Sequence, residues 1–293
     1  MVKWYTRHAD MTQGTTTYAG LTLDTRNNTV SAPKIASGYQ HIKYIVAVLG
    51  IDAALTTDVG VIGVLKLSGD AMYHGDQEMI VGFISEQETG TSVTDLHRYK
   101  PAYVMPTNIW LKDGQVLDLA GAYFGTDIGS PIMSVSIGVE RGRGGTPLQY
   151  RTRGDSHTDA TDAYGAIETK PDGTTGAFDV PTGVKFVPRM FTNVVLNADA
   201  DTLIGGNTFT YEFSGDALGS TAQEIVGYGV MADEGGGTVT ATDAQWGNPA
   251  VLPVELGVTG GNSLSLAAAF KGTDLGTTFV AATLELVGGQ GVA

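Results

Sequence analysis

The sequence predicts an all-β protein built from two tandem copies of one domain, each a β-sandwich or barrel. Short runs of Val, Leu, Ile and Ala are separated by Gly, Thr, Asn and Asp, a pattern typical of strands and turns. LDLAGAYFGTDIGS at residues 117–130 returns as LSLAAAFKGTDLGT at residues 264–277, with eight of the fourteen positions identical. At 293 residues, the chain is long enough for two domains of ordinary size.

The repetition continues on both sides of this stretch. Matching landmarks keep the same order in the two copies, and Pro106 in one corresponds to Pro253 in the other. The period, near 146 residues, is far longer than that of a solenoid repeat, so each copy can close its own core. The further matched segments are 65–72 with 211–218, 77–83 with 223–228, and 103–111 with 250–258.

These matches divide the chain into an N-terminal arm, two domains and a linker. The linker is rich in Gly, Thr and Asp, and its aromatic residues predict an ordered surface excursion rather than a free tether. Weak alternation in the arm predicts an edge strand. The predicted segments are 1–41 for the arm, 42–140 for the first domain, 141–187 for the linker, and 188–293 for the second domain with a short C-terminal tail.

Seven or eight strands are expected in each domain, as in a sandwich or barrel. Apolar residues alternate with the same parity in the last strand of both copies, where Met133 and Val135 correspond to Val280 and Ala282. A shift of one residue would turn them to solvent, so the same face is predicted to be buried twice. The expected strands of the first domain are 42–50, 59–68, 77–86, 93–99, 103–112, 115–122 and 130–140.

Both copies have a glycine-containing reversal before the repeated stretch of fourteen residues. Asp113-Gly114 and Gly260-Gly261 accept positive φ, and each predicts a two-residue turn between flanking strands. The stretch itself contains the pentapeptides GTDIG (125–129) and GTDLG (272–276), which place an Asp between glycines. Because both copies keep the pentapeptide, it is interpreted as a loop that leads into the last strand rather than as an active site.

The bulk composition excludes several classes of function. A formal charge of −14 disfavours nucleic-acid binding, which depends on Lys and Arg to neutralise phosphates. The absence of cysteine excludes disulfides, thiolate metal sites and a cysteine nucleophile. The amino end lacks the apolar segment of a signal peptide, and no run is long enough for a membrane span, so synthesis as a soluble cytoplasmic product is expected. Export by another route stays open.

No motif in the sequence nominates an enzyme, and the prediction is that the protein is not one. None of the histidines has the spacing of a metal site, no GxSxG is present, and the glycine-rich loops lack the Lys and Ser or Thr of a P-loop. Structural or solvated roles are favoured for the histidines, which are His8, His41, His74, His97 and His157.

The predicted linker holds the only candidate ligands. Asp155, Asp159 and Asp162 in GDSHTDATDAYG present oxygens that suit calcium, but their spacing matches no known calcium loop, and a solvated acidic loop is the favoured interpretation. No other cofactor is expected. The linker also begins with a basic cluster, which could pair with an acidic patch on a neighbouring subunit. Its members are Arg141, Arg143, Arg151 and Arg153.

Two similar all-β units in one chain, an inserted segment between them and no enzyme motif resemble the double jelly-roll major capsid proteins. That lineage includes adenovirus hexon and the shells of several tailless bacterial and archaeal viruses with internal membranes. The resemblance is architectural and covers about 200 residues. The succession of strand, tight turn (KDGQ or TGGNS), strand, Gly-rich loop and closing strand is also similar to the end of C1q- and tumour-necrosis-factor-type jelly rolls.

The resemblance implies two tandem jelly rolls and a structural role in a virion. In that family three chains form a homotrimer with six similar barrels, a pseudo-hexameric tile of an icosahedral capsid. The partners implied are lattice neighbours, other capsid or vertex proteins, and a membrane beneath the shell; no direct contact with nucleic acid is expected. The arm would lie at the base of the tile, and the linker would face outward or clasp the next subunit. The implied location is the virion, after synthesis in the host cytoplasm.

Two alternatives stay open. The first is a tandem β-domain adhesin, spike or surface-layer module that binds glycans or calcium through its loop tips. The second is an enzyme on a jelly-roll scaffold, which is disfavoured because no paired carboxylates stand at recognisable positions.

Overall fold

All regular secondary structure in the part of the chain that the structure describes is β-strand, so the all-β prediction is confirmed. No helix in that part has the length and apolar character needed to cross a membrane. The predicted strand at 93–99 lies outside the described residues. The computed structural model describes residues 1–10, 18–24, 29–51, 59–86, 102–125, 131–158, 163–196, 205–219, 221–227, 230–232, 250–272 and 277–288.

The first unit is a sandwich of two antiparallel sheets with the strand order of a jelly roll. One sheet has the order β4-β3-β1-β10-β5-β8 and contains the first and last strands of the unit; we call it the terminal sheet. The other has the order β2-β9-β6-β7, and we call it the medial sheet. The strands are β1 (Val2–Asp10), β2 (Ala19–Gly20), β3 (Leu23–Asp24), β4 (Thr29–Val30), β5 (Tyr39–Ile51), β6 (Val59–Ser68), β7 (Gln77–Glu86), β8 (Tyr103–Trp110), β9 (Asp118–Gly125) and β10 (Pro131–Arg141).

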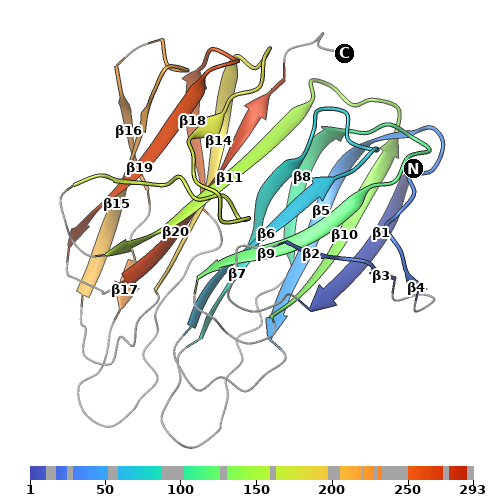
Figure 1. Ribbon diagram of the computed structural model, residues 1–293, viewed down its shortest axis with the longest axis horizontal. Helices are drawn as coiled ribbons and strands as arrows, with labels where there is room; N and C mark the ends of the chain where they lie inside the picture. Colours follow the sequence, from blue (N-terminus) through green and yellow to red (C-terminus); the bar gives the residue numbers. More distant parts are fainter. Residues whose placement is uncertain are drawn as a thin grey trace, which may run out of the picture.

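The second unit repeats this arrangement, which confirms two tandem jelly rolls; Figure 1 shows the two sandwiches side by side. Its terminal sheet has the order β11-β20-β14-β18 and its medial sheet the order β12-β19-β15-β16, while β13 pairs with β19 and β17 with β15. The strands are β11 (Leu148–Thr158), β12 (Gly165–Ala166), β13 (Phe178–Asp179), β14 (Phe186–Leu196), β15 (Gly205–Ser214), β16 (Gln223–Val226), β17 (Val230–Ala232), β18 (Ala250–Gly257), β19 (Ser263–Gly272) and β20 (Thr277–Val287).

The predicted arm and linker contribute core strands of the two sandwiches. β1, from the arm, pairs with β10 over the whole of β1. β11, from the predicted linker 141–187, pairs with β20 from Leu148 to Thr158 in the same way. The expected surface excursion of the linker is wrong for β11, because its pairing partner is the last strand of its unit, far away in sequence. The edge strand expected from the arm is present as β2, at the edge of the medial sheet. We therefore propose unit boundaries near residues 1–141 and 148–288, with 142–147 as the connection.

Two buried arginines support the wider repeat. Arg7 Nε in β1 donates a hydrogen bond to the Ser31 carbonyl oxygen at 2.7 Å, and Arg153 Nε in β11 donates to that of Gly176 at 2.8 Å. Each arginine also donates to the carbonyl oxygen of the residue before it. Both side chains therefore fasten the first strand of their unit to the segment that follows. Arg153, a member of the predicted basic cluster, has a structural role.

The predicted reversals cross between sheets instead of making hairpins. Gly114 and Gly261 have positive φ, 75° and 88°, as expected. However, β8 and β9 lie in different sheets, and so do β18 and β19. Each turn is held by another segment of the same unit, since the Gly114 and Gly261 amides donate hydrogen bonds to the carbonyl oxygens of Ile35 and Val180. The predicted reversals are therefore present, and the structure adds that each joins two sheets, because a tight turn fixes only a change of direction and not the pairing of the strands beside it.

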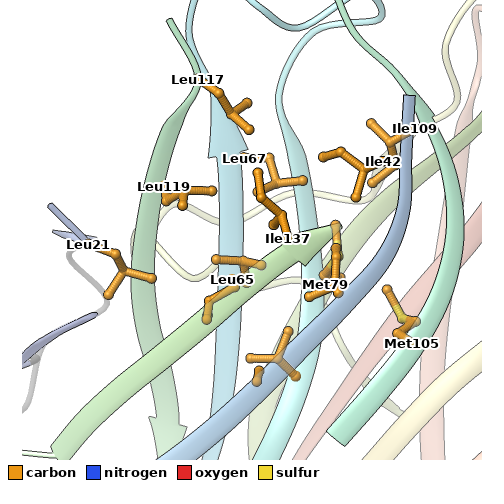
Figure 2. Close-up of a cluster of buried hydrophobic side chains, with 14 of the residues drawn as sticks. Leu21, Ile42, Leu65, Leu67, Met79, Met105, Ile109, Leu117, Leu119 and Ile137 are labelled. Carbon is orange, nitrogen blue, oxygen red and sulfur yellow. The ribbon is translucent and has the colours of Figure 1, made fainter. Parts of the chain in front are cut away.

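Each unit has its own hydrophobic core between its two sheets. In the first unit, Figure 2 shows Leu65, Leu67, Met79, Leu119 and Ile137 gathered in this layer. The apolar parity predicted for the strands is confirmed in both copies. Buried residues at matching positions of the two copies are Met133, Val135, Ile137 and Val139 with Val280, Ala282, Leu284 and Leu286; Leu117 and Leu119 with Leu264 and Leu266; and Leu65 and Leu67 with Phe209, Tyr211 and Phe213.

The edge strands β8 and β18 carry the same protection. Pro106 and Pro253 stand at matching positions on them, and each lies beside a register shift in its pairing with β5 or β14. Glu255, in the second shift, has a positive φ of 48°. Because proline donates no hydrogen bond and an irregular edge fits a new strand poorly, these edges resist pairing with another sheet. Contacts between molecules are then left to sheet faces and loops.

The first glycine of GTDIG gives a test of the interpretation that this pentapeptide is structural. Gly125 has a φ of 126°, and a Cβ there would collide with the carbonyl oxygen of Gly60. Gly125→Ala should therefore lower the free energy of unfolding by about 3 kcal/mol or more. Gly114→Ala is the control, since its Cβ would meet nothing within 4 Å, and about 1–2 kcal/mol is expected there. Equal losses in urea denaturation would contradict the interpretation.

Candidate assembly interface

The two units contact each other through unlike faces. The outward face of a medial sheet is called a medial face below, and the outward face of a terminal sheet is called a terminal face. The medial face of the first unit packs on the terminal face of the second unit. β6, β7 and β9 supply one side, and β11, β14 and β20 the other. A separate apolar cluster fills the contact, with Phe279 partly buried against it. Its members are Ile62, Val64, Ile80, Phe83 and Phe124 from the first unit, and Val195 and Ala281 from the second.

A glycine lets the two sheets approach closely. Gly154 on β11 faces the Phe124 ring, and a Cβ at this position would lie 2.9 Å from a ring carbon. Real Cβ atoms do not make so short a contact, so any larger residue here would push the sheets apart. The position of Gly154 therefore fixes the spacing of the two units.

Hydrogen bonds cross the contact at backbone level. The Ile80 amide donates to Thr283 Oγ1 at 2.9 Å, and Thr283 Oγ1 also shares a hydrogen bond of 2.8 Å with Thr152 Oγ1. Nearby, the Tyr150 amide donates to Gln77 Oε1 at 2.7 Å. Because these groups are buried, breaking the contact in the folded chain would leave them unsatisfied. The second unit is therefore bound to one position on the first.

Charged groups at the rim of the contact add a further link. Glu78 of the first unit accepts a hydrogen bond of 3.0 Å from the Tyr18 hydroxyl and lies 3.9 Å from Arg153 of the second unit. Arg151 Nη1 donates to the Asp76 carbonyl oxygen at 2.6 Å. Burial, and then the Glu78 carboxylate, raise the pKa of Tyr18, so its hydroxyl stays protonated as a donor. Burial lowers the pKa of both arginines, which the nearby carboxylates oppose.

A buried carboxylate in the second unit is satisfied by side chains on two adjacent strands. Glu285 on β20 is 2% exposed. Arg189 on β14 donates to its two oxygens at 2.9 and 2.7 Å, and the Tyr150 hydroxyl on β11 donates at 3.1 Å. The hydrogen bond to Glu285 raises the pKa of Arg189, and burial raises that of Tyr150. Such a satisfied network specifies a geometry more than it adds stability.

The four arginines of the predicted basic cluster do not form one patch. Arg151 and Arg153 are used in the contact between the units. Arg141 lies over the Tyr39 ring at 5.5 Å, and Arg143 lies over the rings of Tyr73 and Trp110 at 4.6 and 5.3 Å. These two residues therefore stack on the first unit near the start of the connection. The Asn108 amide, which donates to the Thr146 carbonyl oxygen at 2.7 Å, holds the connection in the same region.

Of the predicted calcium ligands, only Asp155 is described; Asp159 and Asp162 lie outside the described residues. Asp155 Oδ1 accepts the Ser156 amide at 2.8 Å, and Oδ2 accepts the Thr169 hydroxyl at 3.3 Å. Within the described ranges, no group of three or more His, Cys, Asp or Glu side chains is placed to hold a metal ion. The interpretation of this segment as a solvated acidic loop, with calcium binding as the less favoured alternative, stays a prediction.

The sequence comparison of the copies did not identify the contact residues, although their strands carry a pattern that could have revealed them. In the first copy, β6 reads VGVIGVLKLS, apolar on both faces, whereas its counterpart β15 reads GGNTFTYEFS and alternates. The opposite holds for the last strands. β10 alternates through MSVSIG, whereas β20 alternates only through TLEL and reads FVAA, apolar on both faces, before it. A strand that is apolar on both faces is buried on both. The copy that fails to alternate marks the contact.

The hydroxyl at Thr283 gives the first test of the contact. Thr283→Val keeps the volume but leaves the buried Ile80 amide without its acceptor, so the free energy of unfolding should fall by about 1–3 kcal/mol. Ser136 occupies the matching position in the first unit, where its hydroxyl bonds only to half-buried Thr6, and Ser136→Ala should cost about 0.5–1 kcal/mol. Urea denaturation measures both; a smaller loss for the Thr283 variant than for the Ser136 variant would contradict the assignment.

Calcium binding is tested by thermal melting. Because both oxygens of Asp155 already accept hydrogen bonds, we expect millimolar calcium to shift Tm by less than about 1 °C, and EDTA to have no effect. A calcium-dependent rise in Tm that is lost in Asp155→Asn would establish the site instead.

No family model and no curated protein matches this sequence. Among solved structures, the chain is similar to one reported as the triple jelly roll fold and turret assembly in an archaeal virus, with 10% identity and a TM-score of 0.23 over 97% of this chain. The chain spans 60% of the length of that protein. A second similar structure is from the Gx strain of infectious bursal disease virus, with 10% identity and a TM-score of 0.20, covering 99% of this chain and 71% of the other. Likeness at this level assigns no function.

Proposed function

We propose that this chain is a structural virion protein, the major capsid subunit of an icosahedral shell. The observation that carries the proposal is that one chain holds two copies of the same jelly roll in a fixed mutual orientation. Three such chains around an axis would supply six similar sandwiches, a pseudo-hexameric trimer that meets six lattice neighbours with nearly equivalent surfaces. Duplication then makes a three-fold object resemble a six-fold one.

The chemistry of the described residues supports a structural role. The side chains in unusual environments, among them Arg153, Glu285 and Tyr150, hold strands and units together. The edge strands carry Pro106 and Pro253, which suits a protein that must reach a very high local concentration without edge-to-edge aggregation. A shell subunit needs such protection together with faces that are free to bind copies of itself.

The remaining parts of the proposal follow from a place in a shell. The chain would be made in the host cytoplasm and function in the virion. Its partners would be copies of itself in the trimer and the lattice, other capsid or vertex proteins, and a membrane where one lies beneath the shell. The mechanism is packing rather than catalysis, and it calls for neither a cofactor nor direct contact with nucleic acid.

The oligomeric state tests the proposal. Light scattering coupled to size exclusion, together with native mass spectrometry, should give a species of three times the chain mass of 30.6 kDa. Negative-stain electron microscopy of that species should show six similar lobes. A chain that stays monomeric up to the highest soluble concentration would contradict the proposal. Glycan binding by that monomer would favour the adhesin alternative.

A further inference from the structure

The contact between the units uses one terminal face and one medial face, and the chain has two of each. Among the strands that the structure describes, none packs on the outward terminal face of the first unit or on the outward medial face of the second unit. We infer that these two faces bind each other between copies of this chain, so that the contact inside the chain is repeated between chains. This inference rests on the proposed function and names the surfaces through which the subunits join.

The uncovered terminal face of the first unit carries large apolar side chains that are exposed. Exposed hydrophobic side chains on it are Trp4, Val48 and Val104, which are 44, 39 and 56% exposed. Trp4 stacks on Tyr44 with ring centroids 6.4 Å apart, so the exposed aromatic surface is held in place. Large apolar side chains on the flat face of a sheet are typical of a surface that another protein covers.

The matching face of the second unit shows what covers such a surface. Trp4 on β1 corresponds to Tyr150 on β11, since each pairs with the same position of the last strand. Tyr150 is fully buried because the first unit lies against it, and so is Thr283, the counterpart of Ser136. The terminal face of the second unit is thus buried against the medial face of the first unit, which the same chain supplies. On the first unit, none of the described residues of the chain supplies such a face, and a second copy of the chain has one to offer.

The uncovered medial face of the second unit has side-chain hydrogen bonds that match those on the covered medial face of the first unit. Gln77, which receives the Tyr150 amide, donates to the Gly75 carbonyl oxygen at 2.9 Å, and Gln223 donates to that of Thr221 at 3.0 Å. The pair Tyr18–Glu78 is likewise repeated, because the Tyr164 hydroxyl donates to Glu224 at 2.9 Å.

An exposed valine lies on β16, the outer strand of this face. Val226 pairs with Thr210, as Ile80 pairs with Val64 in the first unit. Ile80 is fully buried under the second unit, whereas Val226 is 67% exposed. A partner seated on this medial face would cover Val226 in the same way. It is therefore the best single position at which to block the contact.

The contact between chains is expected to be weaker than the contact within the chain. Thr208 and Thr210 replace Ile62 and Val64, so the uncovered medial face is more polar. The arginine also differs: Arg7 pairs with Asp24 of its own unit at 3.1 Å. In the second unit, Lys170 stands at the place of that aspartate, and Arg153 reaches across to Glu78. Separate chains would therefore join only after each has folded and only at high concentration.

Because the proposed contact joins unlike faces, it is heterologous and propagates from chain to chain until a ring closes. Three chains of two units each would close a ring of six. Each chain would therefore use two different surfaces, the terminal face of its first unit and the medial face of its second unit. These two faces can be blocked separately.

The test uses two variants that each lose one face. Val48→Glu places a charge on the terminal face of the first unit, at the position that fully buried Asn193 occupies on the covered terminal face of the second unit. Val226→Glu blocks the medial face of the second unit. Val104→Glu is the matched control on the terminal face of the first unit, since its counterpart Val251 stays 48% exposed on the covered face. All three substituted valines are exposed, so circular dichroism and Tm should be unchanged.

We expect both blocked variants to be monomeric, with at least a 100-fold weaker self-association than the unaltered chain, and the control to remain a trimer. Mixed in equal amounts, the two blocked variants should form a dimer and nothing larger, because only one pair of intact faces remains. Analytical ultracentrifugation measures this. Folded blocked variants that stay trimeric, or a mixture that stays monomeric, would overturn the inference and leave the proposed trimer standing. An unaltered chain that is always monomeric would instead remove the proposed function.

Discussion

The packing of the second unit on the first is the interaction on which the rest of the molecule depends. Each jelly roll has its own core, and what makes one body of the two is the close approach of Gly154 to Phe124 and the bond from the Ile80 amide to Thr283. An apolar cluster alone would hold the units together but allow them to slide. The buried hydrogen bonds remove that freedom, because a shifted unit would leave an amide and a hydroxyl without partners.

The divergence of the two copies follows from this contact. A strand that faces the other unit has become apolar on both sides, as in β6, while its counterpart β15 keeps the alternation of a half-solvated strand. The charged residues diverged in the same sense. Arg7 is neutralised within its own unit by Asp24, and Arg153 is neutralised across the contact by Glu78. The same arginine position therefore closes one unit upon itself and ties the other to its neighbour.

Joining unlike faces has a geometric consequence for assembly. A contact between identical faces would use up both and end in a closed pair, whereas this contact leaves one face of each kind uncovered. Pro106 and Pro253 protect the sheet edges at the same time. Growth by strand pairing, which leads to fibres, is thus disfavoured, and association through faces is left open. This combination suits a subunit that must tile without aggregating.

Local pattern was enough to predict most of the strands. Alternation gave the strands near β5, β6, β7 and β10 and the buried parity of Met133 and Val280, because the period of two belongs to the backbone itself. Positive φ at Gly114 and Gly261 could be predicted for a similarly local reason, because glycine accepts this backbone conformation without steric cost. The duplication was also visible, since landmarks such as Pro106 and Pro253 survive in order.

The tertiary structure alone decided which strands pair and which faces meet. β11 was interpreted as part of a linker because its partner β20 lies more than a hundred residues away. The sequence LQYRTRGDSHT does not indicate which strand it pairs with. The reversal at Gly114 was predicted, but not the sheets that it joins, because its local geometry is the same whether the chain stays in one sheet or crosses to the other. The contact between the units was missed for a related reason. It is made by the outward faces of two sheets, and only their relative placement determines whether an apolar outward residue such as Ile80 or Val226 is covered or exposed.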